Sequence, residues 1–350
     1  MNTPHLHTIG IDLGDRNHHI CVLDESGDVI REFSIRNERE ALALLSSQYP
    51  TALIAMEVGA HSPWLSRYLE GRGHRVIVAN ARKLRLISQN ERKCDQRDAV
   101  LLARLARADE NLLHPIQHGS EEAQRDLLQI KLRDNLVRQR VDLISGVRMT
   151  LKSLGIKTSS PKTTAFAKKV RCELHEQGYE EELALITPVL VVIESVNEQI
   201  KELEKDIEKM AAEKYPECEF LRQVSGVGLL TSISFVLTIG DPNRFSKVRD
   251  VGAYLGLVPR RDQSGDCDKQ LRITKAGDSY LRRLLVGSAQ YILGPFGKES
   301  DLRQHGLELA ARGGPRAKKK AVIAIARKLS VLLLGLWKNE SLYEPVRKAA

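Results

Sequence analysis

Apolar residues repeat along positions 189–210 at alternating spacings of four and three residues, the pattern of a long helix that packs along one seam. The seam consists of Val189, Ile193, Val196, Ile200, Leu203, Ile207 and Met210. It requires another helix along its length, because an unbroken apolar stripe is not stable in water. Residues 120–154 show a second long helical pattern with looser spacing. The two helices therefore pair either as an antiparallel hairpin within one chain or as a dimer between chains.

The first hundred residues alternate between strand signals and helix signals. Short apolar, β-branched runs predict strands, and amphipathic stretches bounded by Ser-Pro or Gly predict helices. The predicted strands cover residues 7–12, 18–24, 29–35, 51–57 and 74–80, and the predicted helices cover 38–48, 62–73 and the second half of 81–108. This order predicts a mixed α/β sheet that begins with a three-strand meander.

The chain after the long helices is mostly helical in pattern, with a long polar loop around Ser264. We therefore expect three domains: an α/β domain over 1–115, a helical hairpin or coiled coil over 116–215, and a mostly α-helical domain over 216–350. A length of 350 residues is sufficient for each domain to bury a core of its own.

Positive charge is concentrated in the last third of the chain. From Arg244 onwards there are 22 Lys and Arg residues against 10 Asp and Glu, although the net charge of the whole chain is only +9. A basic segment of this kind favours a polyanionic partner such as nucleic acid.

Other classes of protein are disfavoured by the composition. The five cysteines are scattered without a C-x-x-C pair, so neither a disulfide framework nor a zinc knuckle is indicated. The histidines near the start show no metal-ligand spacing; they are His5, His7, His18 and His19. We find no secretion signal and no apolar run of bilayer length, so we expect a cytoplasmic protein with no membrane partner.

Four acidic residues occupy positions where an unpaired carboxylate would be costly. Asp12 and Glu57 each come at the end of a predicted strand. Asp95 and Asp98 follow at i and i+3 on one face of a predicted helix. Such neighbours repel, so either salt bridges to nearby basic residues or a bound cation must offset the repulsion. Hard divalent ions such as Mg²⁺ prefer carboxylate and phosphate oxygens, and two of them can hold a phosphodiester during in-line displacement.

An acid on the first strand, a second on the fourth and a pair on a later helix is the plan of the ribonuclease H-like nucleases. Through the motifs GIDLG, MEVGAH and KCDQRDA, the sequence resembles the DEDD transposases of the insertion-sequence one-ten type, relatives of the Piv site-specific invertase. The resemblance implies a RuvC-like (ribonuclease H-like) α/β domain. The acids that it assigns to Mg²⁺ binding and catalysis are Asp12, Glu57, Asp95 and Asp98. The phosphate loop of actin-like kinases also contains IGIDLG, but here DRNHH follows it and no second nucleotide loop is present.

The resemblance extends to the last third, where VGAYLGLVPRRDQSGDCDKQLRITKAGDSYLRRLL is similar to the family's transposase domain. It identifies Ser264 with the family's proposed nucleophile. A serine hydroxyl needs a base or a metal, which the acids of the first domain would supply in a composite site. Basic groups nearby would hold the scissile phosphate, and the candidates are Arg260, Arg261, Arg272, Lys275, Arg282 and Arg283.

The resemblance thus implies a DNA recombinase that moves an insertion element through a transient serine–DNA linkage, acting on element and target DNA. It also implies a structured guide RNA (a bridge RNA), for which the basic positions from Arg133 to Arg148 are candidate contacts. The family works as oligomers, dimers or tetramers, and the 189–210 seam is the candidate interface.

Two other classes stay open. One is a RuvC-like, metal-dependent DNA junction nuclease in which Ser264 is only structural. The other is a catalytically silent nucleic-acid-binding protein. A covalent protein–DNA adduct separates the recombinase from the nuclease, and a failure to bind metal indicates the silent protein.

Overall fold

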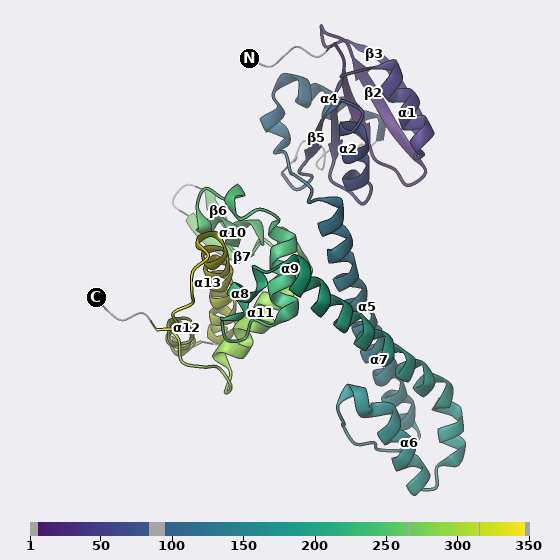
Figure 1. The fold of residues 1–350 in the computed structure, drawn as a ribbon, viewed down its shortest axis with the longest axis vertical. Coiled ribbons are helices and arrows are strands. Elements are labelled where there is room, and N and C mark those ends of the chain that lie inside the picture. Colours follow the sequence, from purple (N-terminus) through teal and green to yellow (C-terminus); the bar gives the residue numbers. More distant parts are fainter. Residues whose placement is uncertain (1–5, 84–94, 265–266, 315, 347–350) are drawn as a thin grey trace. The chain divides into compact units, whose positions relative to one another are not determined.

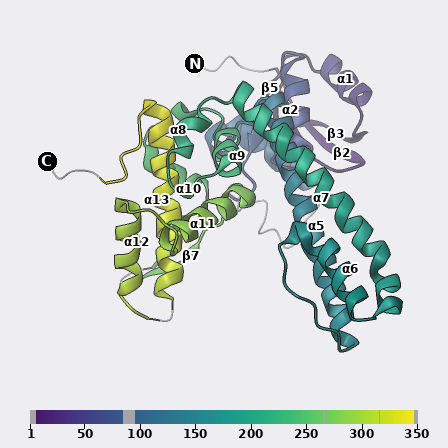
Figure 2. The same cartoon turned by 60° about the horizontal axis from the view of Figure 1, so that its bottom comes forward.

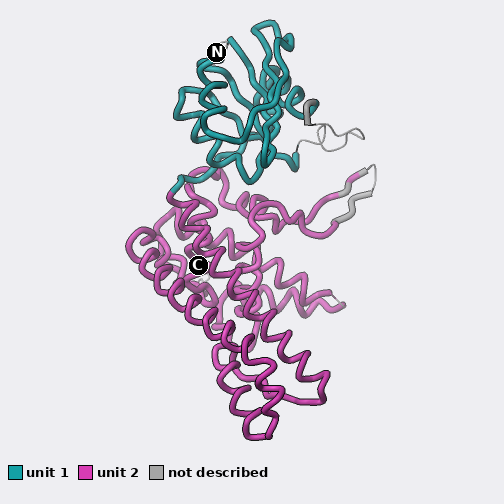
Figure 3. The backbone as a smooth tube through the Cα atoms, turned by 90° about the vertical axis from the view of Figure 1, so that its right-hand side faces the viewer, with its two compact units in different colours: residues 1–121 teal, residues 122–350 magenta. Residues whose placement is uncertain are grey.

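The structure, a computed structural model, describes residues 6–83, 95–264, 267–314 and 316–346; the side chains of residues 95, 96, 262, 264 and 267–270 lie outside this description. The chain divides into two compact units, residues 1–121 and residues 122–350 (Figure 1 and Figure 3). The hydrophobic cores of the two units share no residue, so each unit is a packed body in its own right.

The first unit is built on a five-stranded mixed sheet in the order β3-β2-β1-β4-β5. Its strands are β1 (Thr8–Asp12), β2 (Asn17–Leu23), β3 (Val29–Arg36), β4 (Leu53–Glu57) and β5 (Arg75–Ala79). The first three strands form an antiparallel meander, and β1, β4 and β5 run parallel to one another. The predicted mixed α/β sheet is confirmed, because each strand lies within two residues of its predicted position.

Helices cover both faces of this sheet, since successive side chains of a strand point to opposite sides. The helices are α1 (Arg39–Gln48), α2 (Ser62–Glu70), α4 (Asp95–Ala108) and the 3-10 helix η1 (Glu110–Leu113). The leucines of α1 and α2 pack on the face that carries Ile9 and Ile11. The small and apolar side chains of α4 pack on the opposite face, against Ala55 and Cys21.

The sheet and α4 are in backbone contact at Gly10, in the middle of β1. A Cβ atom built on Gly10 would lie 1.9 Å from the carbonyl oxygen of Ala99 and 2.7 Å from the backbone nitrogen of Ala103. Both atoms belong to a helix backbone that cannot rotate away, so only glycine permits this approach. The helix therefore rests directly on β1, and this contact fixes the helix relative to the end of the strand.

The second unit begins with two long helices and a shorter one between them (Figure 1 and Figure 2). These are α5 (Glu121–Ser153), α6 (Phe166–Glu176), preceded by the 3-10 helix η2 (Thr163–Ala165), and α7 (Glu180–Lys214). Helices α5 and α7 run antiparallel, because Arg133 pairs with Glu204 at 3.0 Å while Arg140, further along α5, pairs with the earlier Asn197 at 2.9 Å. The helix predicted over 120–154 is confirmed to within one residue at each end.

The heptad seam of α7 is buried inside the chain. Ile193, Ile200 and Ile207 are each at most 4 % exposed. Ile193 belongs to a core shared by α5, α6 and α7, and Ile207 to a core that also contains Ile130 of α5. The sequence left open a hairpin within one chain and a dimer between chains, and this packing is that of the hairpin. Two copies could use the same seam only if the hairpin opened, so oligomerisation through 189–210 stays a prediction.

The rest of the second unit is a helical body around one hydrophobic core. Its helices are α8 (Cys218–Arg222), α9 (Leu229–Ile239), α10 (Val251–Tyr254), α11 (Ser279–Leu293), α12 (Asp301–Ala311) and α13 (Ala317–Asn339), with the 3-10 helices η3 (Pro242–Arg244) and η4 (Val248–Asp250). The long loop expected around Ser264 is instead an antiparallel hairpin of β6 (Pro259–Ser264) and β7 (Cys267–Ile273). The loop prediction is wrong because both strands are mostly polar and show no apolar alternation.

Among the helices that the structure describes, one, α7, is long and apolar enough to cross a membrane by length and composition alone. The most apolar stretch of α7 has a mean hydropathy of 1.5. Ile186 and Leu190 of this helix pack into the core shared with α5 and α6, and Glu194 pairs with Arg171 of α6 at 3.2 Å. Helices that pack inside a protein core can be equally long and apolar, so the length and composition of α7 are weak evidence for a membrane span.

Replacing Gly10 by alanine is expected to destabilise the first unit. The added methyl group would have to displace the backbone of α4, and overpacking of this kind costs about 1–3 kcal/mol. Thermal melting and limited proteolysis of Gly10→Ala should show a lower melting temperature or an unfolded first unit. Gly146→Ala is the matched control, because Gly146 is exposed on α5 and an added Cβ would meet nothing within 4 Å. An unchanged melting temperature in Gly10→Ala would contradict the described contact.

Candidate active site

Two of the predicted acids lie at the same edge of the sheet, at the ends of neighbouring parallel strands. Asp12 ends β1 and Glu57 ends β4, in a register that sets Ile11 opposite Met56. Asp12 and Glu57 therefore occupy equivalent positions one residue further along. Strand side chains alternate, so both acids point to the face of Ala55, which is the face covered by α4.

Helix α4 runs antiparallel to β1, which brings the first turns of the helix to this edge. Near the other end of α4, Arg107 donates a hydrogen bond to the carbonyl oxygen of Glu25, in the turn after β2. That turn lies beside the start of β1, because Leu23 pairs with Thr8. The first turns of α4 consequently lie where β1 ends, and they contain Asp98, which is only 5 % exposed.

Three predicted acids, Asp12, Glu57 and Asp98, thus come to one edge of the sheet from three elements. Asp95 is the first residue of α4, and its side chain lies outside the described residues. Within the described part of the chain, no three acidic, histidine or cysteine residues are close enough to share a metal ion. The donor chemistry nevertheless fits a hard divalent cation, since carboxylate oxygens are what such ions prefer. The acids would have to close around the ion as it binds.

Ser264 is the last residue of β6, and its backbone pairs with the first residue of β7. The side chain of Ser264 lies outside the described residues, so its role as a nucleophile stays a prediction. Arg261 of β6 and Arg272 of β7 are both exposed on this hairpin. Arg260 and Lys275 are exposed as well. These four residues present positive charge at the surface.

The other two predicted phosphate contacts are engaged with the protein itself. Arg282 donates through Nη1 to the carbonyl oxygens of Leu255 at 3.1 Å and Ala276 at 2.6 Å, which holds the segment before α11. Arg283 forms an ion pair of 2.6 Å with Asp134 of α5. Sequence shows the charge of an arginine but not its partners. In this structure Arg282 and Arg283 connect elements of the second unit.

The basic positions of α5 that were candidates for RNA contact are also used inside the protein. Arg133 forms its ion pair with α7. Arg140 is only 9 % exposed and donates to Asn197, and the guanidinium of Arg148 lies 5.2 Å from the ring centre of Phe166. These contacts stabilise the helix pair, so they give no support to an RNA surface at these three positions.

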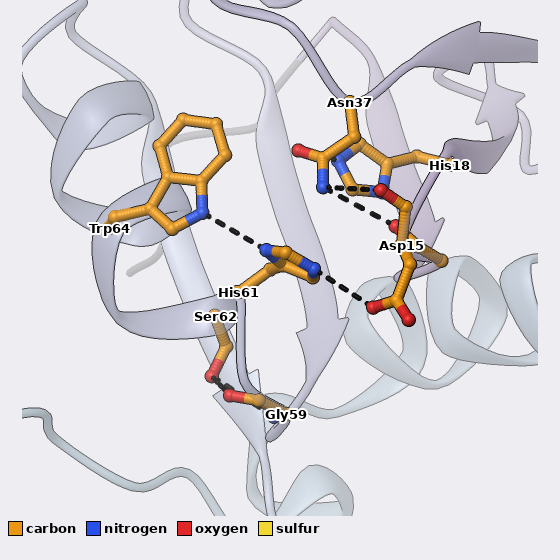
Figure 4. A network of polar contacts seen from close by, with 8 residues as sticks. Asp15, His18, Asn37, Gly59, His61, Ser62 and Trp64 are labelled. Carbon is orange, nitrogen blue, oxygen red and sulfur yellow. Dashed lines mark hydrogen bonds and ion pairs between the residues drawn. The ribbon is translucent and has the colours of Figure 1, made fainter.

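A polar network that the sequence did not indicate lies in the loops beyond β1 and β4 (Figure 4). His61, after β4, lies 3.1 Å from Asp15, after β1, and accepts a hydrogen bond from Trp64 at 3.4 Å. Asn37 donates to the carbonyl oxygen of Asp15 at 3.2 Å, and its own side-chain oxygen lies 3.0 Å from Nε2 of His18. The sequence contained one signal of this network. Polar residues follow β1 and β4 at equivalent places, and the loops after parallel strands lie at the same edge of a sheet.

Comparison with known proteins identifies the family. The model of IS110-type DEDD transposases, described as a transposase, matches residues 9–156, which include all four predicted acids. The model of the transposase IS116/IS110/IS902 family matches residues 218–302, which include Ser264. The chain belongs to the IS110 family of transposases. The family resemblance and the enzyme class expected from the sequence are thereby confirmed.

Some relatives of this IS110-family transposase match it over most of their length, and others match only one part of it. The transposase for insertion sequence element IS1328 of Yersinia enterocolitica is 28% identical over 82% of this chain and 84% of that protein. The transposase for IS1111A of Coxiella burnetii is 26% identical over 96% of this chain and 90% of that protein. The pilin gene-inverting protein of Moraxella lacunata is 32% identical over 31% of this chain and 33% of that protein. The family indicates a DNA recombinase, and its DEDD-type domain suggests a divalent metal.

Acidification is expected to destabilise the first unit of this transposase below about pH 6.5. Burial lowers the pKa of His18, His74 and His118 from 6.5, so the folded protein binds these protons less readily than the unfolded chain does. Stability is therefore retained above that pH and lost as the pH falls through it. Melting temperatures between about pH 7.5 and 5.5 should fall in the wild type and fall less steeply in His74→Gln. A flat profile in the wild type would contradict the burial effect.

Proposed function

We propose that this protein is the transposase of an insertion sequence, which cuts and rejoins strands of element and target DNA through metal-binding acids and a serine nucleophile. The observation that carries the proposal is the convergence of Asp12, Glu57 and Asp98 on one edge of a mixed sheet. We assign the metal chemistry to a RuvC-like domain over 1–115. The hairpin over 116–215 is then the connecting arm, and 216–350 is the domain that carries the nucleophile.

In the proposed reaction the hydroxyl of Ser264 attacks a phosphodiester of one DNA strand. The Oγ–P bond forms as the bond from phosphorus to the bridging sugar oxygen breaks. The serine proton passes to a basic group such as a carboxylate, and the departing sugar oxygen takes up a proton. A hydroxyl from a second strand then attacks the seryl phosphate, which restores the serine and joins the strands without an external energy source.

The acids that we assign to the cation in this reaction are Asp12, Glu57, Asp95 and Asp98. When held by them, Mg²⁺ supplies Lewis-acid stabilisation of the charge that develops on the phosphate oxygens. The acids themselves would hold the cation beside the scissile phosphate, and one of them would accept the serine proton. The choice of Mg²⁺ follows from the all-carboxylate donor set, which suits a hard cation that keeps some of its waters.

Nucleic acid is the partner that the charge distribution favours. The excess of basic residues after Arg244 and the exposed Arg261 and Arg272 on the β6–β7 hairpin support contacts with phosphates. A structured guide RNA and assembly into dimers or tetramers are parts of the proposal that come from the family resemblance. A cytoplasmic location, together with the DNA that the protein rearranges, is also part of the proposal.

A covalent intermediate is the first expected outcome. Incubation with labelled element-end DNA, the matching RNA and Mg²⁺ should give a protein–DNA adduct that survives a denaturing gel. Ser264→Ala and Asp12→Asn should each abolish the adduct, because one removes the attacking oxygen and the other weakens the cation site. Loss of activity by at least about a hundredfold is typical when such a group is removed.

Two variants serve as controls for this assay. Ser153→Ala and Asp142→Asn make the same chemical changes at exposed positions of α5 and should leave the adduct intact. Cleavage without an adduct, lost in Asp12→Asn but kept in Ser264→Ala, would exclude the serine mechanism. That result would instead establish a metal-dependent DNA junction nuclease.

Neutralising the two exposed arginines of the β6–β7 hairpin should weaken nucleic-acid binding in a salt-dependent way. For the double variant Arg261→Gln/Arg272→Gln, the slope of log K against log salt should fall by about 2, since each phosphate contact contributes about 0.9. Affinity should drop for all sequences alike, because phosphates carry no sequence information. Lys168→Gln/Lys169→Gln removes the same charge from the exposed side of α6 and should leave the slope unchanged. Equal slopes in both double variants would place the contact elsewhere.

A further inference from the structure

The pairing of β1 with β4 ends before it reaches the acids at the two strand ends, Asp12 and Glu57. The register between β1 and β4 ends one residue before Asp12 and Glu57. Beyond that point the strands have different neighbours, since Asp12 pairs with His19 of β2 and Glu57 pairs with Ala79 of β5. A contact that joins the chain beyond the last β1–β4 pair therefore adds to the sheet in setting the separation between the two carboxylates.

A side-chain contact joins the loops that follow the two acids. Nε2 of His61, four residues after Glu57, lies 3.1 Å from Oδ1 of Asp15, three residues after Asp12. Figure 4 shows the imidazole of His61 between Asp15 and Trp64. The indole N–H of Trp64 can only donate, and it lies 3.4 Å from Nδ1 of His61. Nδ1 is therefore the acceptor, and Nε2 carries the proton that is donated to Asp15.

Each of the two loops is also held on its own side. Asn37 donates to the carbonyl oxygen of Asp15 at 3.2 Å, which ties the first loop to the end of β3. The buried Ser62 donates to the carbonyl oxygen of Gly59 at 2.9 Å, which closes the second loop. The His61 contact therefore joins two loops that are each held in a defined conformation next to a strand end.

The His61–Asp15 contact is open to solvent. The side chain of Asp15 is 96% exposed and that of His61 is 30% exposed. Pairs as open to solvent as this one contribute little to the stability of a fold. A contact just beyond Asp12 and Glu57 limits how far the two strand ends can separate.

We propose that His61 and Asp15 form a positioning latch that sets the separation of Asp12 and Glu57 for divalent-cation binding. The latch rests on the proposed function, in which these two acids bind the cation. His61 and Asp15 act through the strand ends, and neither is a ligand of the ion. The latch pre-forms one side of the site, so that less of the binding free energy is used to bring the acids together.

Direct measurement of Mn²⁺ binding to the full-length protein tests the latch without DNA cleavage. Electron paramagnetic resonance of the free ion should show binding weakened about two- to fivefold in His61→Phe and Asp15→Ala, a modest change because the contact between them is exposed. The double variant should bind no more weakly than either single variant, because both remove the same contact. Melting temperatures should stay close to that of the wild type, because the contact is exposed.

Two further variants separate geometry from charge. Asp15→Asn keeps an acceptor for His61 without the negative charge and should retain most of the affinity. Asp28→Ala removes an exposed aspartate from the β2–β3 turn, at the opposite edge of the sheet, and should bind Mn²⁺ like the wild type. If Asp15→Asn is as weak as Asp15→Ala while His61→Phe is normal, the effect is one of charge and the latch is excluded.

Asp12→Asn distinguishes failure of the latch from failure of the proposed function. If Asp12→Asn loses Mn²⁺ binding while the latch variants bind like the wild type, only the latch is overturned. If Asp12→Asn itself binds like the wild type, the acids are not the cation site and the proposed function fails with the latch.

Discussion

Backbone contact between β1 and α4 at Gly10 is the constraint on which the rest of the candidate site depends. A side chain at this position would separate the helix from the strand, and Asp98 would move away from the edge where Asp12 and Glu57 end. The small Ala103 continues the close packing one turn further along the helix. The position of Asp98 relative to the two strand-end acids thus depends on a residue that has no side chain.

The elements that could be predicted from the sequence are those in which buried residues recur at a regular spacing. The apolar runs of β1 and β4 and the pattern of α5 located these elements closely. The heptad of α7 predicted a paired helix but not the origin of its partner, because the spacing shows that a seam is buried and not what buries it. The β6–β7 hairpin was missed, since strands that are polar on both faces have no period to detect.

The candidate site was predictable as residue types and not as contacts. Asp12, Glu57 and Asp98 could be identified from the sequence because burying an acidic side chain at a strand end or on a helix face is costly without a partner or a bound cation. Arg282 was expected at a phosphate from its charge alone, yet its guanidinium is occupied by backbone carbonyl oxygens. His61 escaped notice because its contact depends on which strands are neighbours, and local sequence does not contain that information.

The pairing of α5 with α7 connects two cores that do not touch each other. Ile130 and Ile207 belong to the core of the helical body, whereas Ile144 and Ile193 belong to the core near α6. Between the cores the helices meet largely through polar groups such as the guanidinium of Arg140. One extra heptad in each helix would lengthen the arm by about 10 Å and leave both cores intact. The distance between the α6 end of the arm and the helical body can therefore change in evolution or by design without altering either core.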